Sequence, residues 1–163
     1  MILLIQTGGT IDKDYPRATK GWGFEITDPA VERILERAKP SFHFEIVSLL
    51  KKDSQEITDE DRELIAKKCL STDHEKIIIT HGTDTMIDTA AYLANKVKDR
   101  TIVLTGAAKP EHFKDSDADF NVGMAVGSVQ NLPSGVYIAM HGKVLPYDKT
   151  IRETSTGKFV EKE

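Results

Sequence analysis

The chain has 163 residues, of which 39% are hydrophobic and 29% charged, and its formal net charge is −4. A chain of this length and composition forms one domain with a real core, which we assign to residues 1–163. The basic residues are dispersed along the chain, and this speaks against nucleic acid or an acidic membrane as a partner.

The sequence also speaks against disulfides, a metal site and a membrane-spanning segment. The one cysteine, Cys69, leaves no disulfide within the chain, and no HxxxH or CxxC spacing supports a metal site. The apolar run 2–6 is too short to span a membrane and lacks the basic start of a signal peptide. We therefore expect a cytoplasmic protein without a cofactor, whose partner is a small-molecule substrate.

Short apolar runs and amphipathic stretches alternate from the N-terminus onward. The run ILLIQ, residues 2–6, predicts a buried strand. The polar stretch 10–27 is long for a plain connection and is typical of a lid or binding loop. Asp28 and Pro29 then predict a helix start with Asp28 as its cap, and Pro40 ends that helix.

The middle of the chain continues this alternation. Residues 42–50 predict the second strand, and the stretch 58–61 resembles a capping box that opens a helix running to about Leu70. The continuous apolar run 76–80 predicts a strand covered on both faces. Apolar residues at helical spacing over 86–97 predict the next helix.

The last third of the chain adds two more strands. Residues 101–107 and 135–142 predict strands, and the small-residue-rich stretch 116–131 between them predicts a helix. We expect residues 144–151 to form a terminal hairpin arm and the polar tail 158–163 to fray. Five strands separated by helices predict a three-layer, flavodoxin-like α/β fold with a mainly parallel sheet.

Hydroxyls, acids and glycines follow several of the predicted strands. The segments are TGGT (7–10), DSQ (53–55), THGTDT (80–85) and TGAAKP (105–110). The carboxyl ends of parallel strands meet at one edge of a sheet, where such folds bind ligands, so we expect these segments to line one rim. Taken singly, each has a plainer explanation: Thr83 and Asp84 fit a helix cap, Ser54 and Gln55 an ordinary loop, and His81 a structural histidine.

These residue types support attack by a hydroxyl on a carbonyl carbon. A threonine hydroxyl such as that of Thr10 needs a nearby base or relay to remove its proton. Backbone N–H groups around Gly9 and at a helix start near Thr83 can stabilise the oxyanion that forms. Asp84 can pair with an ammonium group, and Ser54 can bind a carboxylate.

A set of motifs resembles, in order and spacing, the bacterial-type L-asparaginases, the asparaginase/glutaminase family. The motifs are TGGTI (7–11), DSQE (53–56), ITHGTDTM (79–86), TGAAKP (105–110) and SDADFN (116–121). The resemblance covers most of the chain but only the N-terminal domain of that family, so we expect the second domain to be absent. It implies hydrolysis of the asparagine side-chain amide to aspartate and ammonia through a threonine acyl-enzyme, with glutamine left open as a substrate.

The resemblance also implies roles in catalysis. Thr10 resembles the primary nucleophile and Thr83 the second catalytic threonine. Asp84 resembles the carboxylate that contacts the α-amino group of the substrate.

Further positions resemble the substrate-binding residues of the family. Ser54 and Gln55 match the pair that binds the α-carboxylate and amino group. Ala107 matches a position whose backbone carbonyl contacts the scissile amide. The backbone at Gly9 and Gly82 completes the expected binding site.

One departure from the family concerns a tyrosine. The family pairs its nucleophile with a tyrosine in the following loop, but the aligned stretch here, KGWGFEI, offers Trp22 or Phe24, and neither can transfer a proton. Tyr15 is the only tyrosine near Thr10, so we expect it to substitute for the family's tyrosine as the partner of Thr10.

A second departure concerns a lysine, which the family places in a helix after the FN pair, beside the second threonine and an aspartate. The matching stretch 121–135 holds no lysine, and Leu132 falls near the position. Lys158, from the C-terminal segment, is the candidate replacement. Without one, the second threonine has no evident base.

The assembly and the activity each leave alternatives. Active sites of the family form between subunits, which predicts a homodimer or larger homo-oligomer. A non-catalytic module that binds small amino acids, a related amidase with another amide substrate and an amidotransferase subunit all stay open. A nucleotide-binding function has little support, because neither GxGxxG nor GxxxxGK occurs.

Overall fold

Six strands form the central sheet of the computed structural model, which describes residues 1–16 and 23–163. Five of them run parallel, and the sixth, β8, joins antiparallel at the edge. In spatial order the strands are β4 (Phe44–Lys52), β1 (Ile2–Gly8), β5 (Lys76–Thr80), β6 (Thr101–Thr105), β7 (Gly135–Met140) and β8 (Lys143–Pro146). The predicted flavodoxin-like order is confirmed, and the first part of the expected hairpin arm forms a sixth strand, β8, paired with β7.

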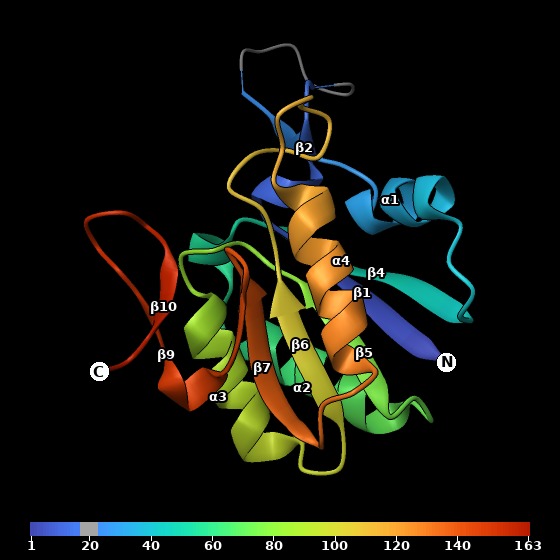
Figure 1. Ribbon diagram of the computed structural model, residues 1–163, viewed down its shortest axis with the longest axis vertical. Helices are drawn as coiled ribbons and strands as arrows, with labels where there is room; N and C mark the ends of the chain where they lie inside the picture. Colours follow the sequence, from blue (N-terminus) through green and yellow to red (C-terminus); the bar gives the residue numbers. More distant parts are fainter. Residues whose placement is uncertain (17–22) are drawn as a thin grey trace.

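Helices cover both faces of the sheet (Figure 1). One face carries α1 (Ala30–Ala38) and α4 (Ala118–Val129), and the other carries α2 (Asp59–Ser71) and α3 (Met86–Lys96). The predicted three-layer architecture is therefore confirmed. Among the described residues, no helix is both long and apolar enough to span a bilayer.

The central strands β1, β5 and β6 are nearly continuous apolar runs because both of their faces are buried. In β1, Leu3 and Ile5 pack in the core beneath α2 and α3, whereas Ile2 and Leu4 pack in the core beneath α1 and α4. This two-sided burial fixes the register of the parallel strands and hence the edge at which their loops emerge. The ends of the predicted strands and helices shift by at most two residues.

The N-terminus of α2 matches its prediction, whereas that of α1 does not. Thr58 and Asp61 form the predicted capping box of α2. The predicted cap of α1 is wrong: Asp28 pairs with Lys51 instead, at 3.1 Å. The α1 amide that a cap would bind is bonded by a carboxylate from another segment, described below.

The long polar stretch after β1 begins and ends with regular structure. A 3₁₀ turn, Thr10–Asp12, leads into a short hairpin of β2 (Lys13–Asp14) and β3 (Glu25–Ile26). We call residues 10–12 the Thr10 turn. Trp22, one of the two aromatic residues considered at the tyrosine position, lies outside the described residues.

The C-terminal segment forms a second hairpin, and the expectation that its tail frays is wrong. β9 (Thr150–Arg152) pairs with β10 (Phe159–Glu161), and β10 of this C-terminal hairpin contacts β8 (Figure 1). Phe159 is only 2% exposed and stacks on His141 with ring centroids 5.9 Å apart. One buried aromatic side chain therefore anchors a tail whose composition is otherwise polar.

Candidate active site

The loops that leave β1, β4 and β5 meet at the carboxyl edge of the sheet and enclose a pocket of about 420 Å³. The residues that line it are Thr10, Lys13, Asp53, Gln55, Glu56, Thr83 and Asp84. Four of the residues expected to carry chemistry, Thr10, Gln55, Thr83 and Asp84, thus share one pocket. They come from segments that lie far apart in the sequence.

Glycines let the three loops touch through their backbones. Gly9 has φ +88°, and a Cβ there would lie 2.4 Å from the Gly82 nitrogen. A Cβ on Gly82 would in turn lie 2.7 Å from the Cβ of Ser54. Side chains at these two positions would force the loops apart, so the glycines bring the hydroxyl and carboxylate side chains within reach of one ligand.

Ser54 braces two of these loops. It is only 4% exposed, its Oγ accepts a hydrogen bond from the Asp84 amide at 3.2 Å, and its carbonyl accepts one from Thr85 Oγ1 at 2.6 Å. The capping explanation for Thr83 and Asp84 does not hold, because the N-cap residue of α3 is Thr85. Thr83 and Asp84 therefore stand before the helix, at the pocket.

The Asp84 carboxylate is bound on both oxygens. Its Oδ2 accepts a hydrogen bond from Gln55 Nε2 at 2.8 Å, and its Oδ1 forms an ion pair with Arg152. The Arg152 guanidinium, helped by the Gln55 amide, lowers the pKa of Asp84 below its usual value. Asp84 is therefore ionised at neutral pH.

Arg152 was missed by the sequence analysis, which looked for a lysine. It lies on β9, and nothing in its local sequence marks it: only the docking of the C-terminal hairpin brings it to Asp84. Leu132 is far from this edge, since its carbonyl accepts a hydrogen bond from Lys76 at the amino end of β5. Lys158 lies just before β10 with its side chain exposed. The cation paired with Asp84 is thus Arg152.

The pocket lining includes a second ion pair. Lys13 Nζ lies 3.0 Å from Asp53 Oδ1, and the Asp53 amide donates to Glu56 Oε2 at 3.3 Å. Cationic and anionic side chains therefore both face the pocket. Such a lining can accommodate a small molecule that carries charges of both signs.

Thr10 is half-buried at the start of its turn, and its carbonyl accepts a hydrogen bond from the Lys13 amide. The Gly9 amide before it donates to the Lys52 carbonyl at 3.0 Å. These bonds hold the backbone on both sides of the Thr10 hydroxyl. The backbone that carries the Thr10 hydroxyl is therefore held in place by hydrogen bonds.

Two other expected site residues lie differently. Tyr15 is 71% exposed, and its ring centroid lies 5.4 Å from that of Phe24, so its ring packs on the β2–β3 hairpin. Ala107 is 2% exposed and packs in the core beneath α1 and α4.

His81 is a structural histidine. It is fully buried between the Gly82 carbonyl, 2.7 Å from Nδ1, and Thr89 Oγ1, 2.9 Å from Nε2. Burial lowers the pKa of His81 to about 4, so it is neutral near pH 7. Within the part of the chain that the structure describes, no group of three or more His, Cys, Asp or Glu side chains could hold a metal ion.

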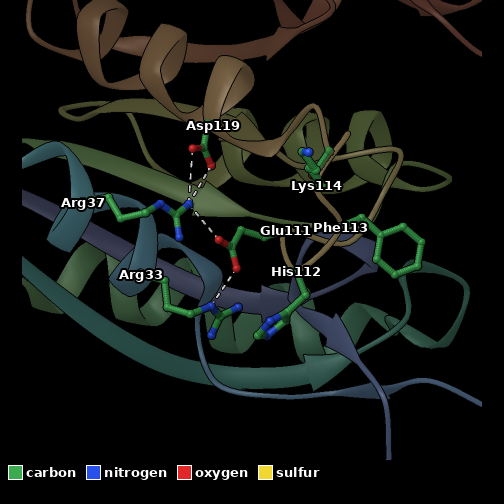
Figure 2. Close-up of a pocket in the computed structure, with 8 residues that line it drawn as sticks. Arg33, Arg37, Glu111, His112, Phe113, Lys114 and Asp119 are labelled. Carbon is green, nitrogen blue, oxygen red and sulfur yellow. Dashed lines mark hydrogen bonds and ion pairs between the residues drawn. The ribbon is translucent and has the colours of Figure 1, made fainter.

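A second pocket, of about 390 Å³, lies where α1 meets the loop between β6 and α4 (Figure 2). Glu111 is its central group: it pairs with Arg33 at 2.6 Å and with Arg37 at 2.7 Å, and Arg37 also reaches Asp119 at 3.0 Å. The ion pairs of Glu111 with Arg33 and Arg37 fasten the loop to α1.

The comparisons with known proteins agree with this arrangement. A family described as "Asparaginase, N-terminal" matches residues 1–159. L-asparaginase 2 of Escherichia coli (strain K12) is 32% identical over 165 residues, which cover 95% of this chain and 47% of that protein. The chain therefore spans about half the length of this curated relative.

Other matches extend the range of relatives. The D subunit of a glutamyl-tRNA(Gln) amidotransferase from Methanococcus vannielii is 42% identical over 89 residues, covering 54% of this chain and 20% of that subunit. The solved structure of the thermostable L-asparaginase from Thermococcus kodakarensis superimposes with a TM-score of 0.84 at 26% identity. The match covers 98% of this chain and 50% of that one.

Proposed function

The chain belongs to the asparaginase family, and on that premise we propose that it is an L-asparagine amidohydrolase that forms an acyl-enzyme on Thr10. The observation that carries the proposal is the shared pocket of Thr10, Thr83 and Asp84. Its volume, about 420 Å³, suits a small amino acid.

The proposed reaction has two steps. The Thr10 oxygen attacks the side-chain amide carbon of asparagine, its proton passes to the departing nitrogen, and ammonia leaves behind an aspartyl ester on Thr10. A water molecule then attacks the ester carbon and releases aspartate and free Thr10. Thr83 lies on the same pocket and serves as the hydroxyl relay of the second step.

Charged groups of the pocket orient the substrate in this proposal. Asp84, held ionised by Arg152, contacts the α-ammonium group together with Gln55. Lys13 and the loop of Ser54 face the α-carboxylate. Arg152 does not take a proton itself, because a guanidinium stays charged in proteins; its role is to orient Asp84.

Tyr15 remains our proposed proton acceptor for Thr10. It follows the Thr10 turn by three residues, on the hairpin that borders the pocket. Since its ring packs on Phe24 at the surface, the proposal requires the hairpin to swing toward Thr10 when substrate binds. Tyr15→Phe keeps the ring but lacks the phenolic oxygen that would accept the proton, so it isolates this role.

A second candidate function is hydrolysis of a different amide. The similarity to D subunits of glutamyl-tRNA(Gln) amidotransferases supports it, because those relatives have other roles within the same family. The pocket lining fits any small substrate with a cationic and an anionic group. Discrimination between amide substrates therefore depends on the distance between those groups and the amide.

We also propose a cytoplasmic location and a homodimer or larger assembly. The structural similarity to a probable cytoplasmic L-asparaginase from Campylobacter jejuni supports the location. The pocket opens at the protein surface, where a neighbouring subunit could cover it and exclude water from the reacting groups.

The proposed function is tested by ammonia release from asparagine, glutamine, succinamate and dipeptide amides, alongside calorimetry with aspartate. Fastest turnover of asparagine supports the proposal, and fastest turnover of another amide supports the second candidate. Binding of aspartate without turnover of any amide would contradict both and leave a non-catalytic binding module.

A further inference from the structure

Asp12 is a fully buried carboxyl group two residues after Thr10, and the reaction proposed above does not use it. An aspartate is rarely buried completely unless it is paired. Among the described residues, no hydrogen-bond partner meets its Oδ2 atom. The burial of this acid beside the proposed nucleophile therefore needs a reason.

Asp12 joins the Thr10 turn to two other segments. Its Oδ1 accepts a hydrogen bond from the amide of Ala30, the first residue of α1, at 2.8 Å. Its carbonyl accepts hydrogen bonds from the Thr27 amide at 2.8 Å and from Thr27 Oγ1 at 3.0 Å. One residue thus ties the turn both to the end of the β2–β3 hairpin and to the start of α1.

The ion-pair network at the second pocket provides a second connection between the Thr10 turn and α1. The Glu111 amide donates to the Ile11 carbonyl at 3.1 Å, and the Glu111 carboxylate binds Arg33 and Arg37 on α1 (Figure 2). The helix therefore holds the Thr10 turn twice: through Asp12 directly, and through the Glu111 loop.

The electrostatic setting of Asp12 favours its neutral form. Burial raises the pKa of Asp12 to about 7, although the Ala30 amide, the Gln6 side chain and the charges of Arg33 and Lys51 all oppose the shift. A neutral carboxyl keeps Oδ1 as an acceptor for the Ala30 amide. An asparagine side chain offers the same acceptor in nearly the same shape.

We propose that Asp12 is a positioning residue for Thr10: by locking the turn to Thr27 and to Ala30, it fixes the hydroxyl at the pocket without touching the substrate. The inference rests on the proposed function, because the placement of Thr10 matters for turnover only if Thr10 reacts. The bonds that hold Gln55 and Asp84 do not involve Asp12. Loss of the Asp12 side chain should therefore disturb the placement of Thr10 but not the binding of substrate.

The first test compares three variants of the full chain. Asp12→Ala is expected to lower kcat for asparagine by at least about tenfold and to change the Kd of aspartate less than about threefold, as misplacement of a reacting group predicts. Asp12→Asn, which keeps the acceptor, should retain kcat within about threefold. Asp99→Asn, at an exposed loop, is the matched control. Wild-type kcat in Asp12→Ala, or equal losses in Asp12→Ala and Asp12→Asn, would overturn the proposal.

The second test does not depend on activity. Amide hydrogen exchange at Ala30, which loses its acceptor Oδ1, and at Lys13 in the adjoining turn should speed up at least about tenfold in Asp12→Ala but little in Asp12→Asn. The Thr27 amide bonds to the Asp12 backbone carbonyl, which both variants keep. If Asp12→Ala fails to fold, Thr27→Val removes one bond to the Asp12 carbonyl and should speed exchange at Lys13. Unchanged exchange in the folded variants would overturn the positioning role. If the wild type released no ammonia, the proposed function would fail, while these exchange rates would still decide on Asp12.

Discussion

Arg152 and Asp84, 68 residues apart in the sequence, form an ion pair at the rim of the candidate active site. The pair joins the C-terminal hairpin to the loop after β5. Both side chains are partly exposed, 35% for Arg152 and 43% for Asp84. Its contribution to folding is therefore small, and its consequence lies in the orientation of the Asp84 carboxylate.

Replacing Arg152 tests this orientation. Arg152→Ala should lower kcat/KM for asparagine about tenfold, mainly by raising KM, while changing the free energy of unfolding by less than about 1 kcal/mol. Arg152→Lys should recover part of the loss, because an ammonium can still pair with one oxygen of Asp84. Lys158→Ala, on the same hairpin, gives the comparison. A larger loss in Lys158→Ala than in Arg152→Ala would show that the sequence-based lysine expectation was right after all.

Phe159 should hold Arg152 in place through the hairpin. Phe159→Ala removes a ring that is 2% exposed and lies 6.0 Å from the Arg152 guanidinium carbon, so it should cost about 3 kcal/mol of stability and raise KM as Arg152→Ala does. Denaturant unfolding and steady-state kinetics measure the two effects. Ile151→Ala, at an exposed position of β9, should change neither. An unchanged KM in Phe159→Ala would contradict the claim that Phe159 holds Arg152 at the pocket.

Gly9 should tolerate no side chain. Gly9→Ala places a Cβ 2.4 Å from the Gly82 nitrogen at φ +88°, and we expect it to lose about 2 kcal/mol or more of stability together with most activity. Gly123→Ala, in α4 with open space around the added Cβ, should instead gain up to about 1 kcal/mol. Thermal unfolding of both variants provides the measurement. Equal stability of the two would contradict the close loop contact.

The raised pKa of Asp12 should make the free energy of unfolding depend on pH. The folded chain keeps the Asp12 proton up to about pH 7, whereas the unfolded chain releases it near the ordinary value of 3.8. The contribution of Asp12 to the free energy of unfolding therefore falls as pH rises from about 4 to about 7, by up to about 4 kcal/mol. His81 acts in the opposite direction between its folded pKa of about 4 and its ordinary value of 6.5. The difference between wild type and Asp12→Asn isolates the Asp12 effect.

Urea unfolding at several pH values between 5 and 8 measures this difference. Relative to Asp12→Asn, the free energy of unfolding of the wild type should fall from pH 5 to about pH 7 and then level off. A constant difference would mean that Asp12 is ionised throughout and that its burial does not raise its pKa.

The fold was largely predictable because its determinants are local. Continuous apolar runs, the capping box at Thr58 and the strand–helix alternation predict the sheet order and the layers. The C-terminal hairpin was not predictable in the same way, because one residue, Phe159, outweighs the polar composition of its tail. Burial of a single ring depends on the surface it meets, and composition does not report that surface.

The candidate site was predictable only in part. Thr10, Gln55, Thr83 and Asp84 follow strands directly, so the parallel sheet gathers them on one edge. Arg152 reaches the same place by tertiary docking, which no local pattern encodes. Likewise, Asp12 reads as an ordinary polar loop residue, and only the packing of α1 and β3 around it reveals its burial.

The proposed reaction depends most directly on the hydroxyl groups of Thr10 and Thr83, two residues that line one pocket. The decisive measurement is ammonia release from asparagine by wild type, Thr10→Ala and Thr83→Val, each shown to be folded by circular dichroism. We predict that both variants lose activity at least about a thousandfold while the fold persists. Turnover at the wild-type rate in both folded variants would contradict it.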